Sequence, residues 1–215
     1  EDEERPSLID NIYVGRVEKI INSLNACFVD LGLRRLGFLA LAEILPVGVG
    51  VTSGDTVSEY LCEGDKVCVQ ILRDAFEDKG PKLTTHLRLV SRSVILIPGD
   101  NTIKISHRIT NSEIRTQLKK LLFKLSSGDE GFIARTAAEI ATKEEITANV
   151  TSLRAEYQRV KDKLYKSSTP TLLYGMVDGV TRTLRDRTPG DVSKIVIDDI
   201  EAYLKAKKFL EQEAP

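Results

Sequence analysis

Residues 133–139, IARTAAE, place an arginine beside a hydroxyl side chain at the end of a short apolar run. The run predicts a strand, and backbone N–H groups become free where a strand leads into a turn. A guanidinium, a hydroxyl and free N–H groups can converge on one phosphate. Arg135 and Thr136 are therefore candidates for phosphate binding. The alternative is that this pair forms a solvated cap before a helix.

Phe28 and Phe38 are candidates for stacking on nucleic-acid bases. In residues 25–32, NACFVDLG, strand alternation places Cys27 and Val29 on one face and Phe28 on the other, more polar face. Phe38 follows in the next predicted strand, so a hairpin could bring both rings onto one surface, where aromatic rings bind bases. The alternative is that both rings fill the interior of a barrel.

Charged residues at two turns add weaker candidates. Lys79 lies in EDKGPKLTT, at a turn that leads into a strand, where a lysine can contact a phosphate or remain an ordinary loop residue. Asp198 and Asp199 follow the apolar run KIVI, and carboxylates at strand ends can bind magnesium. We favour the alternative that one of them caps the last helix, and we predict no metal site here.

The composition limits the classes of function. The chain has 215 residues, 41% hydrophobic and 29% charged, as in globular proteins, and its net charge of −1 argues against coating nucleic acid through a general positive field. The spacing of the three cysteines does not match a zinc site, and with only two histidines a metal cluster is not expected. The odd number of cysteines favours a reducing, cytoplasmic location. No run is long enough to span a membrane, and the given sequence does not open with the charged-then-apolar pattern of a signal peptide. Because the chain starts at Glu1 and its one methionine is Met176, we expect a longer natural sequence.

Short β-like runs separated by Gly, Asp and Asn predict a small Greek-key barrel over residues 11–90. A loop rich in Gly, Ser and Thr, residues 46–61, interrupts them and is expected to contain one helical turn near residues 57–61. The five candidate strands are residues 11–21, 25–32, 36–41, 65–75 and 81–89.

After Val90 the pattern changes to that of an α/β unit. Residues 93–100 and 131–137 predict strands, and each precedes a helix that opens with a capping box, Thr110 to Glu113 and Thr142 to Glu145. Beyond these helices, the sequence predicts a linker, a helix, a single strand and a last amphipathic helix, which cover residues 167–170, 176–186, 194–198 and 200–212.

Ordered landmarks over nearly the whole chain resemble one family. Residues 11–44, NIYVGRVEKIINSLNACFVDLGLRRLGFLALAEI, resemble the S1 RNA-binding domain of the ribonuclease E/G family, and KGPKLTT followed by SVILIP continues the match. IARTAAE is similar to the family's 5′-sensor segment, and ISHRI, LLYGMVDGVTRTLRD and KIVID look like its other landmarks, in the family's order.

The resemblance implies an α+β fold: a five-stranded S1/OB-fold β-barrel, then an α/β 5′-sensor module, then a partial RNase-H-like α/β subdomain. The corresponding boundaries are residues 1–10 for an N-terminal linker of the RNase-H-like part, 11–90 for the barrel, 91–168 for the sensor and 169–215 for the partial subdomain.

Family members are magnesium-dependent endoribonucleases that cut single-stranded RNA, so the resemblance implies RNA as partner, preferably 5′-monophosphorylated, and a homo-oligomeric full-length protein acting in RNA processing and decay. The family's catalytic aspartates lie downstream of the position of Pro215, so this chain is expected to hold no catalytic residue, and Mg²⁺ is expected only for the full-length enzyme. The implied RNA contacts are Phe28, Phe38 and Lys79, and the implied contacts to the 5′ end are Arg135, Thr136, Ile95 and Ser91.

Three positions depart from the family pattern. Ser91 stands where the sensor has glycine, NTIKISHRI replaces a GGISRRI-like stretch, and Leu8 stands where some members carry a basic RNA contact. Two other functions stay open. The chain can be an independent S1-type RNA-binding protein, or an assembly module in which Phe28 and Phe38 contact another subunit and Arg135 forms a structural ion pair.

Overall fold

The computed structural model describes residues 7–44, 52, 54–175, 180–181, 183–184, 192 and 194–213 of the chain. The chain divides into two compact units, one made of Glu1–Arg88 and Tyr157–Gly175 and the other of Leu89–Glu156 and Met176–Pro215. In the part of the chain that the structure describes, no helix has the length and apolar character needed to cross a membrane.

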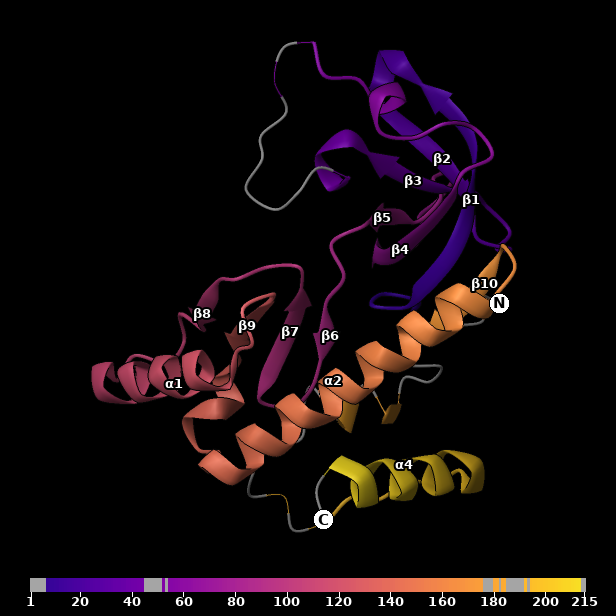
Figure 1. Ribbon diagram of the computed structural model, residues 1–215. Coiled ribbons are helices and arrows are strands. Elements are labelled where there is room, and N and C mark those ends of the chain that lie inside the picture. The colour runs from indigo at the N-terminus through magenta and orange to yellow at the C-terminus, as the bar shows by residue number, and fades with distance from the viewer. Residues whose placement is uncertain are drawn as a thin grey trace. The chain divides into compact units, whose positions relative to one another are not determined.

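The first unit contains a barrel that closes because β1 pairs with both β2 and β4 (Figure 1). Its strands are β1 (Ile12–Ile21), β2 (Ala26–Asp30), β3 (Gly37–Ala40), β4 (Lys66–Arg73) and β5 (Lys82–Thr84). The β3–β5 pairing is parallel and the others are antiparallel. Short 3-10 turns lie at Asn22–Leu24, Leu41–Glu43 and Val57–Glu59. The five predicted strands, the helical turn near residue 57 and the α+β class with an S1/OB-like barrel are confirmed.

Alternation along the strands decides which side chains fill the barrel. In β2, Cys27 and Val29 are fully buried, whereas Phe28 and Asp30 are only half-buried. Each apolar side chain removed from water in this way contributes about 1.5–3 kcal/mol to folding. The buried core of the barrel comprises Tyr13, Val17, Cys27, Val29, Leu31, Leu39, Leu41, Val57, Val67, Val69, Ile71 and Leu83.

Two later segments complete the first unit. Strand β10 (Thr171–Tyr174) pairs with β1, and the last turns of helix α2 (Lys143–Lys166) contribute Val160 to a cluster with Ile12 and Leu173. Residues 157–175 thus pack with the barrel. The predicted boundaries at residues 90 and 168 were drawn from the sequence pattern and the family resemblance, and they stay a prediction.

The second unit contains a four-stranded sheet in the order β6-β7-β9-β8. Apolar side chains on one face, among them Leu96, Phe132 and Ala134, are buried, and helix α1 packs against β8 (Figure 1). The elements are β6 (Leu89–Val90), β7 (Val94–Pro98), β8 (Ile103–Ile105), α1 (Ser112–Leu125), β9 (Glu130–Ala134), a 3-10 turn at Thr136–Glu139, the first half of α2, and α4 (Ile200–Glu213).

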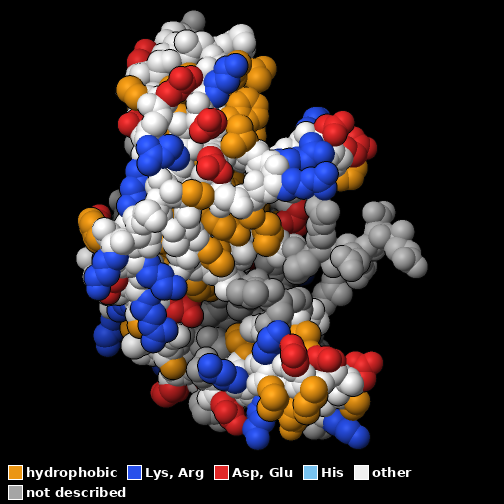
Figure 2. Space-filling view, turned by 90° about the vertical axis from the view of Figure 1, so that its right-hand side faces the viewer, with side chains coloured by type: hydrophobic (Ala, Val, Ile, Leu, Met, Phe, Trp, Pro, Cys, Tyr) orange, Lys and Arg blue, Asp and Glu red, His pale blue; other side chains and the backbone are white. Residues whose placement is uncertain are grey.

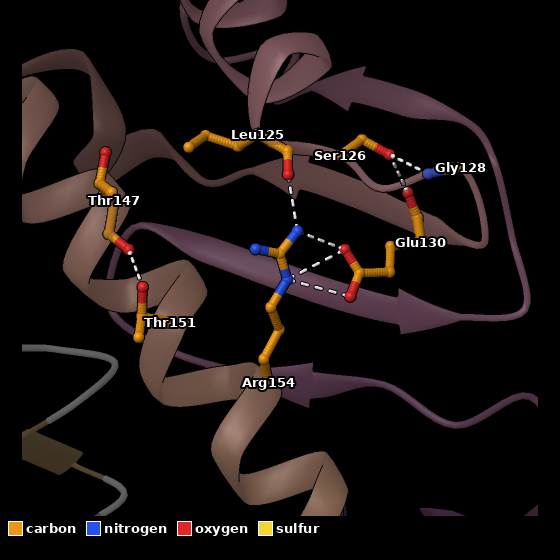
Figure 3. Close-up of polar contacts among 7 residues, drawn as sticks. All are labelled: Leu125, Ser126, Gly128, Glu130, Thr147, Thr151 and Arg154. Atoms are coloured by element: carbon orange, nitrogen blue, oxygen red, sulfur yellow. Dashed lines mark hydrogen bonds and ion pairs between the residues drawn. The ribbon is translucent and has the colours of Figure 1, made fainter.

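An ion pair ties the start of β9 to α2. Arg154 Nε donates to both carboxylate oxygens of Glu130 at 3.0 Å, and its Nη2 donates to Oε2 at 2.5 Å (Figure 3). The same Nη2 donates to the carbonyl of Leu125 at 2.6 Å, at the end of α1. Hydrogen bonds from Arg154 lower the pKa of Glu130. One guanidinium therefore joins α1, β9 and α2, and Arg135 directly follows β9.

The helix starts follow their capping side chains. At α2, Thr142 Oγ1 accepts from Glu145 N at 3.2 Å and Glu145 Oε2 accepts from Thr142 N at 2.7 Å, which confirms the predicted capping box. At α1 the predicted cap at Thr110 is wrong. Asn111 caps instead, because its Oδ1 accepts from the N–H groups of Glu113 and Ile114 at 2.9 and 3.2 Å.

The C-terminal segment agrees with the prediction in part. Helix α4 confirms the predicted last helix, but the predicted strand at residues 194–198 is wrong, since these described residues pair with no strand. An apolar run becomes a strand only when a neighbouring edge satisfies its backbone groups. Of the helix predicted over residues 176–186, most lies outside the described residues, and residues 180–181 and 183–184 are helical.

Candidate functional site

Arg135 follows β9 directly and is held by backbone groups of the β6–β7 turn. Its N–H donates to the carbonyl of Ser93 at 2.8 Å, and its Nη1 donates to the carbonyl of Ser91 at 2.7 Å. Arg135 is extended, with φ −79° and ψ 169°, and the chain then enters the 3-10 turn that begins at Thr136. These contacts orient a half-buried guanidinium at the end of the sheet.

A cavity of about 510 Å³ lies at this end of the sheet and has a basic rim. Arg92, His107, Arg108 and Arg135 line it. Hydroxyl groups add hydrogen-bonding capacity, because Ser106 Oγ and Thr136 Oγ1 also line the cavity and lie 3.2 Å apart. Guanidinium groups and hydroxyls are the side chains that bind phosphate oxygens in proteins. The cavity can therefore hold a phosphate group.

Apolar side chains form another part of the cavity wall. Ile95 of β7 and Ile133 of β9 are directly paired across the sheet, are half-buried and both line the cavity. A base next to a bound terminal phosphate could pack on this apolar surface. The structure thus places Ile95, Arg135 and Thr136 around one cavity, and their contacts to RNA stay a prediction.

The Ser91 side chain forms its hydrogen bonds within the β6–β7 turn. The residue is buried, and its Oγ donates to the carbonyl of Val94 at 2.8 Å while accepting from Val94 N at 3.2 Å. Its hydroxyl therefore closes the β6–β7 turn, and its carbonyl accepts from Arg135. In this conformation Ser91 positions Arg135, and a direct contact of its hydroxyl with phosphate stays a prediction.

Phe28 and Phe38 lie on the outer face of the barrel. They are directly paired between β2 and β3, their ring centroids are 5.8 Å apart, and the ring planes are inclined by 65°. Both side chains are half-buried and neither belongs to the barrel core. The structure therefore decides between the two alternatives for the rings in favour of a shared outer surface, which is the arrangement needed for stacking on bases.

Two lysines that the sequence analysis did not single out flank the rings. Lys19 of β1 pairs with Phe28, and Lys82 of β5 pairs with Phe38. Lys82 Nζ lies 3.1 Å from Glu43 Oε1. Lys82 precedes the core residue Leu83, so strand alternation was the available signal that its side chain faces outward.

Lys79 lies in an exposed turn before β5. Its backbone exchanges hydrogen bonds with Phe76 at 2.9 and 3.1 Å, and its side chain is exposed. The next residue is Gly80, where a Cβ would lie 1.8 Å from the carbonyl oxygen of Leu36, so only glycine lets this turn pack against the β2–β3 loop. RNA contact by Lys79 stays a prediction. Leu8, at the position of a basic contact in some family members, packs against the barrel core.

Asp199 acts as a helix cap. Its Oδ1 accepts from Ala202 N at 2.7 Å in the first turn of α4. Among the described residues, no three His, Cys, Asp or Glu side chains gather as metal ligands. The three cysteines are free thiols, and burial raises the pKa of both Cys27 and Cys68 to about 11.

Comparison with known proteins identifies relatives over the whole chain. The sequence pattern of the ribonuclease E/G family matches residues 88–215. The chain is 30% identical to Ribonuclease G of Escherichia coli K12, with 100% of the chain and 45% of that protein covered. For Ribonuclease G of Haemophilus influenzae the identity is 31%, over 97% of the chain and 44% of the relative. The identity to Ribonuclease E of Nostoc sp. is 29%, over 94% of the chain and 30% of the relative. The chain thus spans less than half the length of these relatives.

Proposed function

Since this chain belongs to the ribonuclease E/G family, we propose that it binds single-stranded RNA and senses a 5′-monophosphate within a ribonuclease. The observation that carries the proposal is the cavity in which Arg135 and Thr136 meet Arg92 and Arg108 beside an apolar wall. The barrel supports it with a pair of outward-facing rings. Cytoplasmic location, self-association and cleavage by the longer protein are parts of the same proposal.

The cavity suits a terminal phosphate because three arginines line it. A phosphate monoester carries close to two negative charges at neutral pH, and bidentate hydrogen bonds from an arginine to such a group are strong and directional. The bond from Arg135 Nη1 to Ser91 holds the side chain in place, so less conformational entropy is lost when phosphate binds. A 5′-hydroxyl end provides no charge for these groups. A triphosphate must place further phosphates within the same 510 Å³.

The barrel supplies the second contact. Each base that stacks on an exposed aromatic ring contributes about 1–3 kcal/mol without sequence preference. Phe28 and Phe38 therefore suit a single strand of any sequence.

The test is a fluorescence titration of one labelled oligonucleotide carrying a 5′-hydroxyl, 5′-monophosphate or 5′-triphosphate end. We expect the monophosphate to bind most tightly. Arg135→Ala should weaken its binding about thirtyfold, on the order of 2 kcal/mol, and leave the hydroxyl end nearly unchanged.

Arg159→Ala is the matched control, since Arg159 is an exposed arginine on α2 outside the cavity lining. Circular dichroism of both variants checks that the fold is kept. Equal affinities for the three ends, or an Arg135→Ala variant that keeps the preference, would contradict the sensor function.

A further inference from the structure

A continuous row of side chains crosses the outer face of the barrel. The strand pairings run Lys19 to Phe28, Phe28 to Phe38, and Phe38 to Lys82. Directly paired residues on neighbouring strands project to the same face of a sheet. Because neighbouring strands lie about 4.8 Å apart, the row is about 14 Å long. Its order is basic, aromatic, aromatic, basic.

Glu43 is built into one end of this row. Its carbonyl accepts from both the N–H and the Oγ1 of Thr85, each at 2.9 Å, so the backbone of the turn at Leu41–Glu43 is joined to the chain just after β5. The carboxylate lies 3.1 Å from Lys82 Nζ, and the two side chains are 21% and 41% exposed. Glu43 is therefore held beside Lys82 by its backbone, independently of the ion pair.

We propose that Lys19 and Lys82 bind phosphates of the single strand whose bases stack on Phe28 and Phe38, and that Glu43 competes with the RNA for Lys82. The proposal rests on the proposed RNA-binding function of the barrel. A strand that places bases over the two rings leads its backbone past both ends of the row, at Lys19 and Lys82. A phosphate that reaches Lys82 has to share it with Glu43 or displace that carboxylate.

The first experiment measures how binding depends on salt. The probe is a labelled oligouridylate of about ten nucleotides with a 5′-hydroxyl end, so that recognition of a terminal phosphate makes no contribution. Each phosphate contact on a single strand contributes about −0.7 to the slope of log K against log salt. Lys82→Gln and Lys19→Gln should each weaken binding about fivefold and make the slope shallower by about 0.7. Lys119→Gln, at an exposed lysine of α1, changes the charge equally and should leave the slope unchanged.

The second experiment is a double-mutant cycle on Lys82 and Glu43. Glu43→Gln should tighten binding about threefold in the otherwise unchanged chain, as expected for release of a surface ion pair. In the Lys82→Gln background the same change should have a smaller effect, and the difference isolates the competition from the general loss of negative charge. Equal effects in both backgrounds would overturn the role of Glu43, and unchanged slopes for both lysine variants would overturn the phosphate contacts.

A ring variant separates this proposal from the one on which it rests. Phe28→Ala should weaken binding of the same oligouridylate whether or not Lys19 and Lys82 contact phosphates. If Phe28→Ala weakens binding but the lysine variants do not, the RNA-binding face stands and the inference about the lysines is wrong. If none of these variants changes binding, both are wrong. Thermal unfolding of every variant shows whether a loss of binding is a loss of fold.

Discussion

Ser91 shows how a residue near a cavity can act through its backbone. Its hydroxyl forms hydrogen bonds with the backbone of Val94 in the β6–β7 turn, while its carbonyl accepts a hydrogen bond from the Arg135 guanidinium. The residue is 3% exposed, so its polar atoms depend on these partners. Serine at this position therefore fits a role in fixing the turn that orients Arg135.

Ser91→Ala tests this role. The change leaves the N–H of Val94, which lies at a buried residue, without the Ser91 oxygen, and we expect a loss of about 1–3 kcal/mol in the free energy of unfolding. Urea denaturation provides the measurement. Ser152→Ala, at an exposed position of α2, is the control and should change stability by less than about 0.5 kcal/mol. A wild-type unfolding curve for Ser91→Ala, together with a weakened 5′-phosphate preference, would instead favour a direct phosphate contact.

Helix α2 depends on its first turn because it begins with a reciprocal capping box. Thr142→Ala removes the acceptor for Glu145 N, and an N-cap of this kind stabilises a helix by about 1 kcal/mol. We expect a lower melting temperature by calorimetry. Thr147→Ala is the matched control, because the hydroxyl of Thr147 donates to the carbonyl of Lys143 within its own helix and alanine has the higher helix propensity. Equal melting temperatures for the two variants would show that the cap is dispensable.

The ion pair between Glu130 and Arg154 gives the second unit a pH dependence. The pKa of Glu130 lies below its ordinary value of 4.5, first because Arg154 donates hydrogen bonds to the carboxylate. A carboxylate with a lowered folded-state pKa stabilises the fold above the unfolded-state pKa, and this stabilisation is lost as the pH falls through the folded-state pKa. The pair therefore contributes fully at pH 7 and progressively less below about pH 4.5.

Arg154→Met is expected to lower the free energy of unfolding by about 1–2 kcal/mol at pH 7, since Arg154 is 36% exposed and solvent screens the pair. Urea titrations at several pH values should show this difference shrinking in acid. A smaller difference should persist there, because the bond to the carbonyl of Leu125 is also lost. Arg159→Met, on the same helix, should match the wild type throughout. A difference that is independent of pH would contradict the assignment to Glu130.

Charge is balanced over the chain, with 31 basic and 32 acidic residues. On the face shown in Figure 2, Lys and Arg side chains are interspersed with Asp and Glu. If the proposed function is correct, RNA affinity comes from a few local contacts, such as the row from Lys19 to Lys82 and the cavity at Arg135, since the balanced charge provides no general positive field.

The salt dependence of RNA binding tests whether the phosphate contacts are few and local. With about four phosphate contacts, the slope of log K against log salt for a 5′-monophosphorylated oligonucleotide should be near −3. Fluorescence titrations over a series of potassium chloride concentrations give this slope. A slope near −7 would require about ten phosphate contacts and would point to a much longer basic track than these residues form.

Local patterns in the sequence were sufficient for much of the fold. Short β-like runs identified the five barrel strands, and alternation placed Phe28 and Cys27 on opposite faces of their strand. A T-x-x-E pattern located the start of α2 at Thr142. The position of Arg135 at the end of a strand was also predictable. These features depend on interactions between residues only a few positions apart, so a short segment of sequence is enough to predict them.

Features that depend on contacts between distant residues required the folded chain. The row from Lys19 to Lys82 exists only because strand register brings β1, β2, β3 and β5 into line. The bond from Arg135 to Ser91 joins residues 44 positions apart, and the run at residues 194–198, although apolar, has no pairing edge in the described chain. Register and edge pairing depend on which backbone groups meet across the fold, and no short segment contains that information.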